Sequence, residues 1–264
     1  MRRVSWGLIV AGILLGVLLA GSGVGSAAER GFKEVDFPTA GGIRAHADIY
    51  SPKEKSSTLI ILFHQAGWSR GEYREIAPKI VRLGYQVMAV DQRAGKAVNG
   101  VPNETHRRAT KKKAGTNYLD AYADLVAALK YATKTLKPQR IIVWGSSYSA
   151  ALVFRLAAEH PDEIAALLAF SPGEYFQKEH GTEYIQGFAK RVKDPVFVTS
   201  SKAERDKAKP IFDAVPVEKK ILFTPASLGQ HGSRALWERG SDNDVYWAAV
   251  SVFLEEYAPP APSD

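Results

Sequence analysis

Residues 141–150 read IIVWGSSYSA, an apolar run that ends in a glycine and is followed by three serines. An uninterrupted apolar run is typical of a strand that is buried on both faces of a parallel sheet. Residues 148–160 follow with the apolar spacing of a helix. Open α/β sheets bind their ligands beyond the carboxyl ends of the strands. The stretch therefore predicts a strand-to-helix turn that exposes one serine as a nucleophile.

The spacing of small residues selects Ser147 among the three serines. Strand and helix approach closely at such a turn, so the residues two before and two after the nucleophile must be small. Gly145 and Ser149 meet this condition for Ser147, whereas Ser146 would place Trp144 there. Ser149 itself would lie one turn into the helix. The pattern is G-x-S-x-S rather than G-x-S-x-G, and the alternative reading is a simple helix cap.

The rest of the chain alternates strand patterns with helical patterns. Residues 32–52, with two glycines in the middle, predict an opening antiparallel hairpin. Buried strands are predicted at 58–65, 85–93, 140–147, 164–173, 194–201 and 219–225, and helices at 72–84, 118–136, 148–160, 202–215 and 244–257. This alternation predicts a mostly parallel α/β sheet covered by helices on both faces.

Three segments stand apart within or around the single domain expected at 29–257. Residues 1–28 carry two arginines, an apolar run and a close of small residues, as a secretory signal peptide does, so we expect export to the periplasm or the medium. The alternative is an uncleaved anchor, which would be the chain's only attachment to a membrane. Residues 93–117 are predicted to form a long, irregular, lid-like insertion. Residues 258–264, APPAPSD, are predicted to be a disordered tail.

Composition and short motifs indicate a globular chain and argue against a disordered protein and a nucleic-acid-binding one. The 264 residues are 45% hydrophobic and 24% charged, which is typical of a globular chain. The formal net charge of +7 is modest, and part of the excess falls in RRATKKK at 107–113, which is read as a solvated loop rather than a nucleic-acid site, with an anionic partner as the alternative. The chain has no cysteine. It shows neither a metal-ligand spacing nor a phosphate loop, so no metal and no cofactor are expected. Nothing in the sequence indicates an oligomeric state.

Across roughly residues 32–257 the chain resembles the α/β-hydrolase superfamily, in the branch of dienelactone-hydrolase-like proteins and small serine esterases. The resemblance rests on the serine turn and on the stretch HGSRAL at 231–236. In that family the nucleophile, the acid and the histidine follow in this order after different strands. The resemblance implies His231 as the histidine. Among six histidines it alone combines a late position, a strand end and a flexible glycine neighbour.

The acid implied by the resemblance is Glu204, in SSKAE at 200–204, where the family more often has Gly-x-x-Asp. Asp206 is a near alternative, and Glu174, after the preceding strand, is a third. A serine hydroxyl becomes a nucleophile only when an imidazole takes its proton, and that imidazole needs an acid to fix its tautomer.

Two backbone N–H groups are also needed to bind the negative oxygen that develops during acyl transfer. One is expected from Tyr148, directly after the nucleophile. The other is expected from the loop FHQAGWSRGEY at 63–73, which resembles the family's His-Gly-x-Gly loop. By that match Ala66 donates, with Gln65 as a neighbour in the hole. His64 is expected to brace the loop rather than to take part in chemistry.

Together these features predict an exported serine hydrolase that cleaves small-molecule carboxylic esters or thioesters through an acyl-enzyme. A peptidase of the same fold is the nearest alternative. A catalytically silent protein of this fold, serving as a binding module, is the other. The departures at Glu204 and Ser149 from the usual family residues keep that second alternative open.

Overall fold

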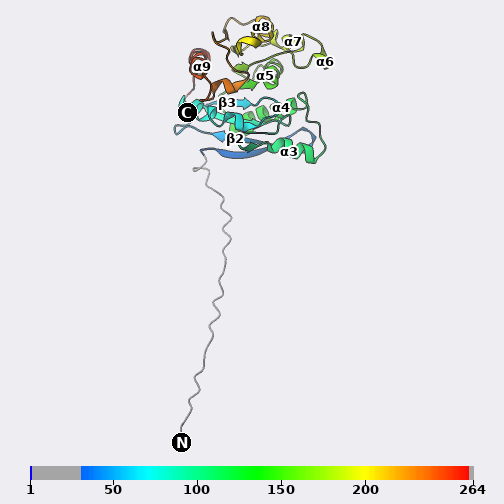
Figure 1. Ribbon diagram of the computed structural model, residues 1–264, viewed down its shortest axis with the longest axis vertical. Helices are drawn as coiled ribbons and strands as arrows, with labels where there is room; N and C mark the ends of the chain where they lie inside the picture. Colours follow the sequence, from blue (N-terminus) through cyan, green and yellow to red (C-terminus); the bar gives the residue numbers. More distant parts are fainter. Residues whose placement is uncertain (2–30, 262–264) are drawn as a thin grey trace.

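The computed structural model describes Met1 and residues 31–261, and a single eight-stranded sheet runs through it (Figure 1). Its strands are β1 (Lys33–Thr39), β2 (Ile43–Tyr50), β3 (Thr58–Phe63), β4 (Gln86–Asp91), β7 (Arg140–Ser146), β8 (Ala166–Phe170), β9 (Val196–Thr199) and β10 (Lys220–Phe223). They lie in the order β1-β2-β4-β3-β7-β8-β9-β10. The β1–β2 and β2–β4 pairs of this sheet are antiparallel, and its other neighbouring strands pair in parallel. The predicted fold class is confirmed.

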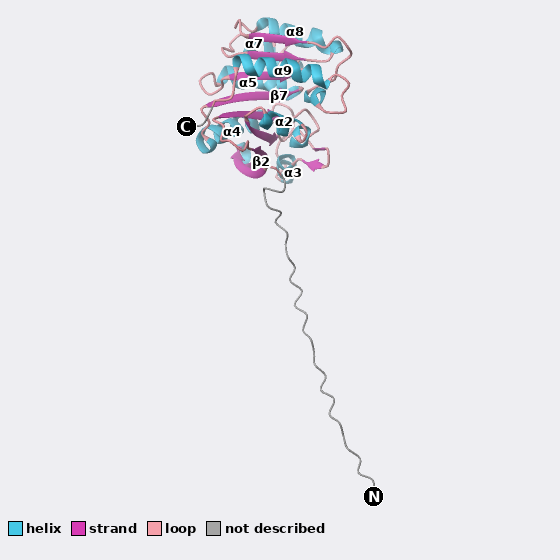
Figure 2. Cartoon of the chain, turned by 90° about the vertical axis from the view of Figure 1, so that its left-hand side faces the viewer, coloured by secondary structure: helices cyan, strands magenta, loops and turns pink. Residues whose placement is uncertain are grey.

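Helices cover both faces of this sheet (Figure 2). They are α2 (Ile76–Arg82), α3 (Glu104–Lys111), α4 (Tyr122–Tyr131), α5 (Tyr148–Glu159), α6 (Gln177–His180), α7 (Tyr184–Ala189), α8 (Arg205–Ala214) and α9 (Asn243–Tyr257). In β3, Leu59 and Ile61 pack into the core formed with α4 and α5, whereas Ile60 and Leu62 pack into the core formed with α2 and α9. Successive side chains of a strand point to opposite faces, so a strand buried on both faces must be apolar throughout.

Residues 93–117 are not the irregular insertion that the sequence predicts. The segment contains a short hairpin of β5 (Ala97–Val98) and β6 (Val101–Pro102), followed by α3. The side chain of Asn103 caps α3 by accepting the His106 N–H at 2.7 Å. The Thr105 hydroxyl is buried against β2, where it accepts the His46 N–H at 2.9 Å. These polar residues gave a loop-like pattern, but their side chains satisfy buried backbone groups and fix the segment to the sheet.

The basic run at 107–113 is likewise not a solvated loop, because most of it lies in α3. Arg108 forms an ion pair with Asp36 of β1 at 2.6 Å, and the Lys112 ammonium donates to the Gly42 carbonyl. The run therefore fastens α3 to the opening hairpin.

The predicted disordered tail is wrong for residues 258–261. The Tyr85 hydroxyl donates to the Ala258 carbonyl at 3.0 Å, and the Ser57 N–H donates to the Ala261 carbonyl at 3.1 Å. The Ala261 N–H donates in turn to the Thr58 hydroxyl at 3.0 Å. Prolines lack an N–H but leave carbonyls free to accept, so a proline-rich tail can still dock along the start of β3. Residues 262–264 lie outside the described part.

The predicted signal peptide at 1–28 lies, apart from Met1, outside the described residues. Among the helices of residues 31–261, none combines the length and the apolar character needed to cross a bilayer.

Candidate active site

Ser147 occupies a sharp turn between β7 and α5. Its φ of 59° and ψ of −122° lie in a region that residues with a side chain rarely adopt. The close approach of strand and helix requires glycine at position 145, because a Cβ there would lie 2.3 Å from the Ser149 carbonyl oxygen. The Ser147 N–H donates to the Phe170 carbonyl of the neighbouring strand at 2.8 Å, which anchors the turn. The surrounding structure therefore holds Ser147 in a strained position at the carboxyl edge of the sheet.

Ser149 stands where the family more often has glycine, and its hydroxyl has a structural use. It accepts the Ser146 N–H at 2.9 Å and lies 2.7 Å from the Phe63 carbonyl at the end of β3. The extra side chain thus ties the serine turn to the neighbouring strand.

Glu204 and His231 meet at the ends of two further strands. Glu204 closes a short 3₁₀ helix (Lys202–Glu204) after β9, and His231 follows β10. Nδ1 of His231 lies 2.5 Å from Oε1 of Glu204. The Ser201 hydroxyl donates to the other carboxylate oxygen at 2.7 Å. The Glu204 carboxylate is therefore held from both sides while it faces the imidazole.

The hydrogen bonds keep Glu204 ionised. Burial alone would raise the pKa of this carboxyl, but the hydrogen bonds from His231 and Ser201 outweigh it and lower the pKa to about 2. An ionised carboxylate at Nδ1 fixes the tautomer in which Nε2 can accept a proton, and it stabilises the imidazolium that then forms.

The two alternative acids have other environments. Both oxygens of the Glu174 carboxylate accept backbone N–H groups at the start of α7, from Ile185 at 2.8 Å and Gln186 at 2.9 Å. Asp206 is exposed in the first turn of α8. Of the three carboxylates that the sequence left open, Glu204 is the one that contacts His231.

Ser171 joins the acid to the segment that carries His231, residues 224–236 after β10, here called the histidine loop, a role that the sequence analysis missed. Its hydroxyl donates to Oε2 of Glu204 at 3.0 Å and accepts the Gly232 N–H at 2.9 Å. Ser171 follows β8 with a φ of 55°, a second strained residue at the same edge of the sheet. The available signal was its position directly after an apolar strand.

The sequence predicts that the backbone N–H groups of Tyr148 and Ala66 bind the oxyanion. Within residues 31–261, neither the Tyr148 N–H nor the Ala66 N–H donates to another protein group. The Gln65 N–H, by contrast, donates to Oε2 of Glu72 at 2.8 Å. The Gln65 N–H is therefore not available to an oxyanion, and Ala66 remains the predicted donor in this loop, with Gln65 as its neighbour.

His64 braces the loop after β3. Its ring is fully buried, Nδ1 lies 2.8 Å from the Gln65 carbonyl, and Nε2 accepts the Gln92 N–H at 3.0 Å. Burial lowers its pKa to about 4, so the imidazole is neutral near pH 7. These contacts agree with the bracing role expected from the sequence.

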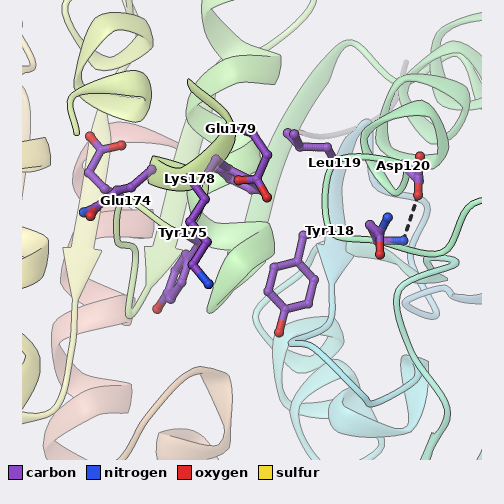
Figure 3. Close-up of a pocket in the computed structure, with 10 residues that line it drawn as sticks. Tyr118, Leu119, Asp120, Glu174, Tyr175, Lys178 and Glu179 are labelled. Carbon is purple, nitrogen blue, oxygen red and sulfur yellow. Dashed lines mark hydrogen bonds between the residues drawn. The ribbon is translucent and has the colours of Figure 1, made fainter. Parts of the chain in front are cut away.

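A pocket of about 660 Å³ opens beside the serine turn (Figure 3). Its walls come from two segments, 117–120 and 174–179. Tyr118 stacks on Tyr148 with 4.8 Å between ring centroids. The Tyr175 hydroxyl donates to the Ser171 carbonyl at 2.8 Å and also interacts with Ser147. Figure 3 shows both rings extending in the same direction from their segments. Of the insertion predicted to act as a lid, only its last residue, 117, lines this pocket.

One carboxylate and histidine cluster elsewhere has the composition of a metal site. Ligand atoms of Glu34, His46 and Asp48 lie within 4.8 Å of one another. Two guanidinium groups already pair with Asp48, from Arg70 at 3.0 Å and from Arg74 at 3.1 Å. These ion pairs explain the cluster as part of a charge network on the opening hairpin.

The sheet order, the helices on both faces and the strained serine turn define the chain as a member of the α/β-hydrolase superfamily. The family model described as serine aminopeptidase, S33 (Hydrolase_4) matches residues 54–228, and the chain belongs to this family. The match includes Ser147 and Glu204 and ends before His231.

Two curated relatives match about half of this chain in sequence. Epoxide hydrolase B of Mycobacterium tuberculosis is 24% identical over 154 residues, which cover 54% of this chain and 40% of the relative. Monoacylglycerol lipase of Mycolicibacterium smegmatis is 26% identical over 139 residues, which cover 53% of this chain and 46% of the relative. The chain thus spans less than half of the length of these relatives.

Solved structures are similar over most of the described fold. An esterase from Pyrococcus furiosus aligns with a TM-score of 0.67 at 18% identity, over 88% of this chain and 95% of that one. Dienelactone hydrolase from Anabaena variabilis aligns with a TM-score of 0.65 at 15% identity, over 86% of this chain and 99% of that one. At these identities the likeness establishes the fold.

Proposed function

We propose that the protein is a serine hydrolase that cleaves carboxylic esters or thioesters through an acyl-enzyme. The observation that carries the proposal is the strained Ser147 turn, which lies on the same sheet edge as the Glu204–His231 pair. The Tyr148 N–H, directly after Ser147, donates to no protein group within the described residues. Each group suits one role of acyl transfer. The esterases and the lipase among the similar proteins support an ester bond as the target.

In the proposed reaction, the Ser147 hydroxyl oxygen attacks the acyl carbon while Nε2 of His231 takes its proton. Glu204 holds Nδ1 and balances the imidazolium charge. The Tyr148 and Ala66 N–H groups bind the oxyanion. The imidazolium then protonates the leaving alcohol or thiol, and a water molecule, activated by the same imidazole, releases the acid.

The Ser147 hydroxyl has the side chain of Tyr175 as a neighbour. Within residues 31–261 no hydrogen bond joins its hydroxyl to His231, and the hydroxyl interacts with Tyr175 instead. Catalytic hydrogen bonds are often long before substrate binds.

The pocket beside the turn is the proposed substrate site. Its volume of about 660 Å³ falls within the range of small-molecule sites. Aromatic and aliphatic side chains line it together with charged ones, including Leu119, Phe176, Asp120 and Lys178. This mixed lining suits a small ester or thioester of mixed polarity.

Turnover of p-nitrophenyl esters of increasing acyl length tests the proposal. We expect hydrolysis by the wild type and loss of at least ~10³-fold in kcat for Ser147→Ala. Ser227→Ala, a change at an exposed serine, is the matched control and should keep full activity. An aminoacyl p-nitroanilide assayed in parallel tests the peptidase alternative. Absence of turnover of every acyl substrate would favour the silent binding protein.

We further propose that the chain is exported, on the strength of the pattern at 1–28 alone. Expression of the full chain in a bacterial host, followed by mass measurement of the exported protein, tests this. Cleavage after Ala27 or Ala28 is the expected result. A full-length chain that stays with the membrane would favour the anchor.

A further inference from the structure

Glu72 is a buried carboxyl group that the proposed reaction does not use. It lies in a short 3₁₀ helix (Arg70–Tyr73) and is fully buried. This helix follows residues 64–69, the loop after β3 that carries Ala66, here called the oxyanion loop. Oε2 of Glu72 accepts the Gln65 N–H at 2.8 Å, and its Oε1 accepts the Ser146 hydroxyl at 2.7 Å. One carboxyl group thus contacts both the loop that carries Ala66 and the turn that carries Ser147.

Ser146 also links Glu72 to the histidine loop. The Ser146 hydroxyl accepts the Ser233 N–H at 2.9 Å, two residues after His231. The Ser233 hydroxyl accepts the Trp144 indole N–H at 2.9 Å. Glu72 is therefore linked through a single hydroxyl to the segment that positions the imidazole.

Close packing at Gly232 shows how tightly these loops meet. A Cβ at this position would lie 2.5 Å from the Ser146 hydroxyl and 2.8 Å from the Gln65 side-chain oxygen. The φ of Gly232 is +69°, which also favours glycine. The oxyanion loop, the serine turn and the histidine loop are thus in direct contact around Glu72.

The buried environment of Glu72 disfavours the charged form of its carboxyl group. Burial raises its pKa to about 7, although the hydrogen bonds from Ser146 and Gln65 and the charge of Arg234 act in the opposite direction. The nearby ionisable hydroxyls are those of Tyr73 and Tyr148. Buried groups with strongly shifted pKa values concentrate at functional sites.

We propose that Glu72 is a positioning residue of the hydrolase, whose carboxyl group sets the oxyanion loop and the histidine loop at their working distance from Ser147. The inference rests on the proposed function. By holding the Gln65 N–H, Glu72 orients the next peptide, which carries the Ala66 N–H toward the oxyanion. By holding Ser146, it fixes Ser233 and with it the approach of His231.

Kinetics of p-nitrophenyl acetate hydrolysis by two Glu72 variants test the role. Glu72→Ala removes both acceptors, and kcat should fall at least ~100-fold, as for loss of an oxyanion donor, with KM within ~3-fold of wild type. Glu72→Gln keeps an acceptor for the Gln65 N–H and replaces the acceptor for Ser146 by an amide donor, from which the Ser146 hydroxyl oxygen can accept, so it should restore kcat to within ~10-fold of wild type. Glu75→Ala, whose carboxylate bonds the Glu238 N–H at 2.9 Å outside the site, is the matched control.

Each result decides between distinct conclusions. Wild-type kcat in folded Glu72→Ala, or a raised KM with unchanged kcat, would overturn the positioning role and leave the hydrolase intact. A wild type without ester turnover would overturn the proposed function and this inference with it. If circular dichroism shows that Glu72→Ala does not fold, Ser146→Ala replaces it. That variant breaks the link to Ser233, and kcat should fall at least ~10-fold, while wild-type kcat would contradict the inference.

Discussion

Oε1 of Glu204 lies 2.5 Å from Nδ1 of His231, although the two residues are 27 positions apart and follow different strands. Parallel strands end at one edge of a sheet, so residues that follow neighbouring strands meet there. Because β9 pairs with β10 in parallel, the segments that follow these two strands lie side by side.

Replacement of Glu204 by glutamine should lower kcat at least ~100-fold with the fold intact. An amide keeps the size of the side chain but can stabilise the wrong imidazole tautomer and cannot balance the imidazolium, a change that costs about 10⁴-fold in serine proteases. Ester turnover and circular dichroism measure the two effects. Glu174→Gln and Asp206→Asn are the matched controls, and each should cost less than ~10-fold. A crippling effect of Glu174→Gln would mean that the acid follows β8 instead.

Glu204 should also make stability depend on acid pH. Its pKa is about 2 in the folded chain against an ordinary value of 4.5. A carboxyl whose pKa is lowered by folding contributes stability that is complete above the unfolded value and is lost as the pH falls toward the folded value. The free energy of unfolding in urea should therefore decrease between about pH 5 and pH 2, and decrease less steeply in Glu204→Gln. Equal slopes for the two proteins would contradict the hydrogen-bonded carboxylate.

Ser171→Ala should weaken both catalysis and stability. The change removes a donor to Glu204 and an acceptor for the Gly232 N–H. Loss of these bonds should cost about 1–3 kcal/mol of stability, and the freed histidine loop should lower kcat about 10-fold. Urea denaturation and ester turnover measure the two effects, with Ser227→Ala as control. Unchanged kcat would show that Glu204 and His231 hold each other without Ser171.

Gly145→Ala should destabilise the fold by at least about 2 kcal/mol, because its Cβ would collide with the Ser149 backbone. Gly187→Ala in α7 is a sharp control. No heavy atom lies within 4 Å of a Cβ there, so alanine should leave stability unchanged or raise it by up to about 1 kcal/mol. Equal midpoints for the two variants in urea would contradict the close strand–helix approach.

Much of the fold could be predicted because its signals are local. The apolar runs at 58–63 and 141–144 specify strands buried on both faces, and small residues at 145 and 149 specify the serine turn. Element boundaries were less well determined. The helix expected at 72–84 divides into the 3₁₀ helix Arg70–Tyr73 and α2. Helix 118–136 ends in a π-helical turn over Ala132–Leu136.

The contacts that organise the site could not be read from the sequence. Glu72 and Ser171 look like an ordinary loop acid and an ordinary loop serine, and their partners lie 74 and 61 positions away at Ser146 and Gly232. The fold of 93–117 depends in the same way on side chains such as Asn103, whose amide donates to the Gln92 carbonyl at 2.8 Å. Such long-range hydrogen bonds leave no periodic pattern in the sequence.

The identity of the nucleophile is the central claim, and mass spectrometry of a fluorophosphonate adduct tests it most directly. The three serines at 146, 147 and 149 lie within four positions, so fragmentation must place the adduct on a single residue. We predict one adduct per chain, on Ser147, and none in Ser147→Ala or in heat-denatured protein. An adduct on Ser146 or Ser149, or labelling that persists in Ser147→Ala, would contradict the assignment.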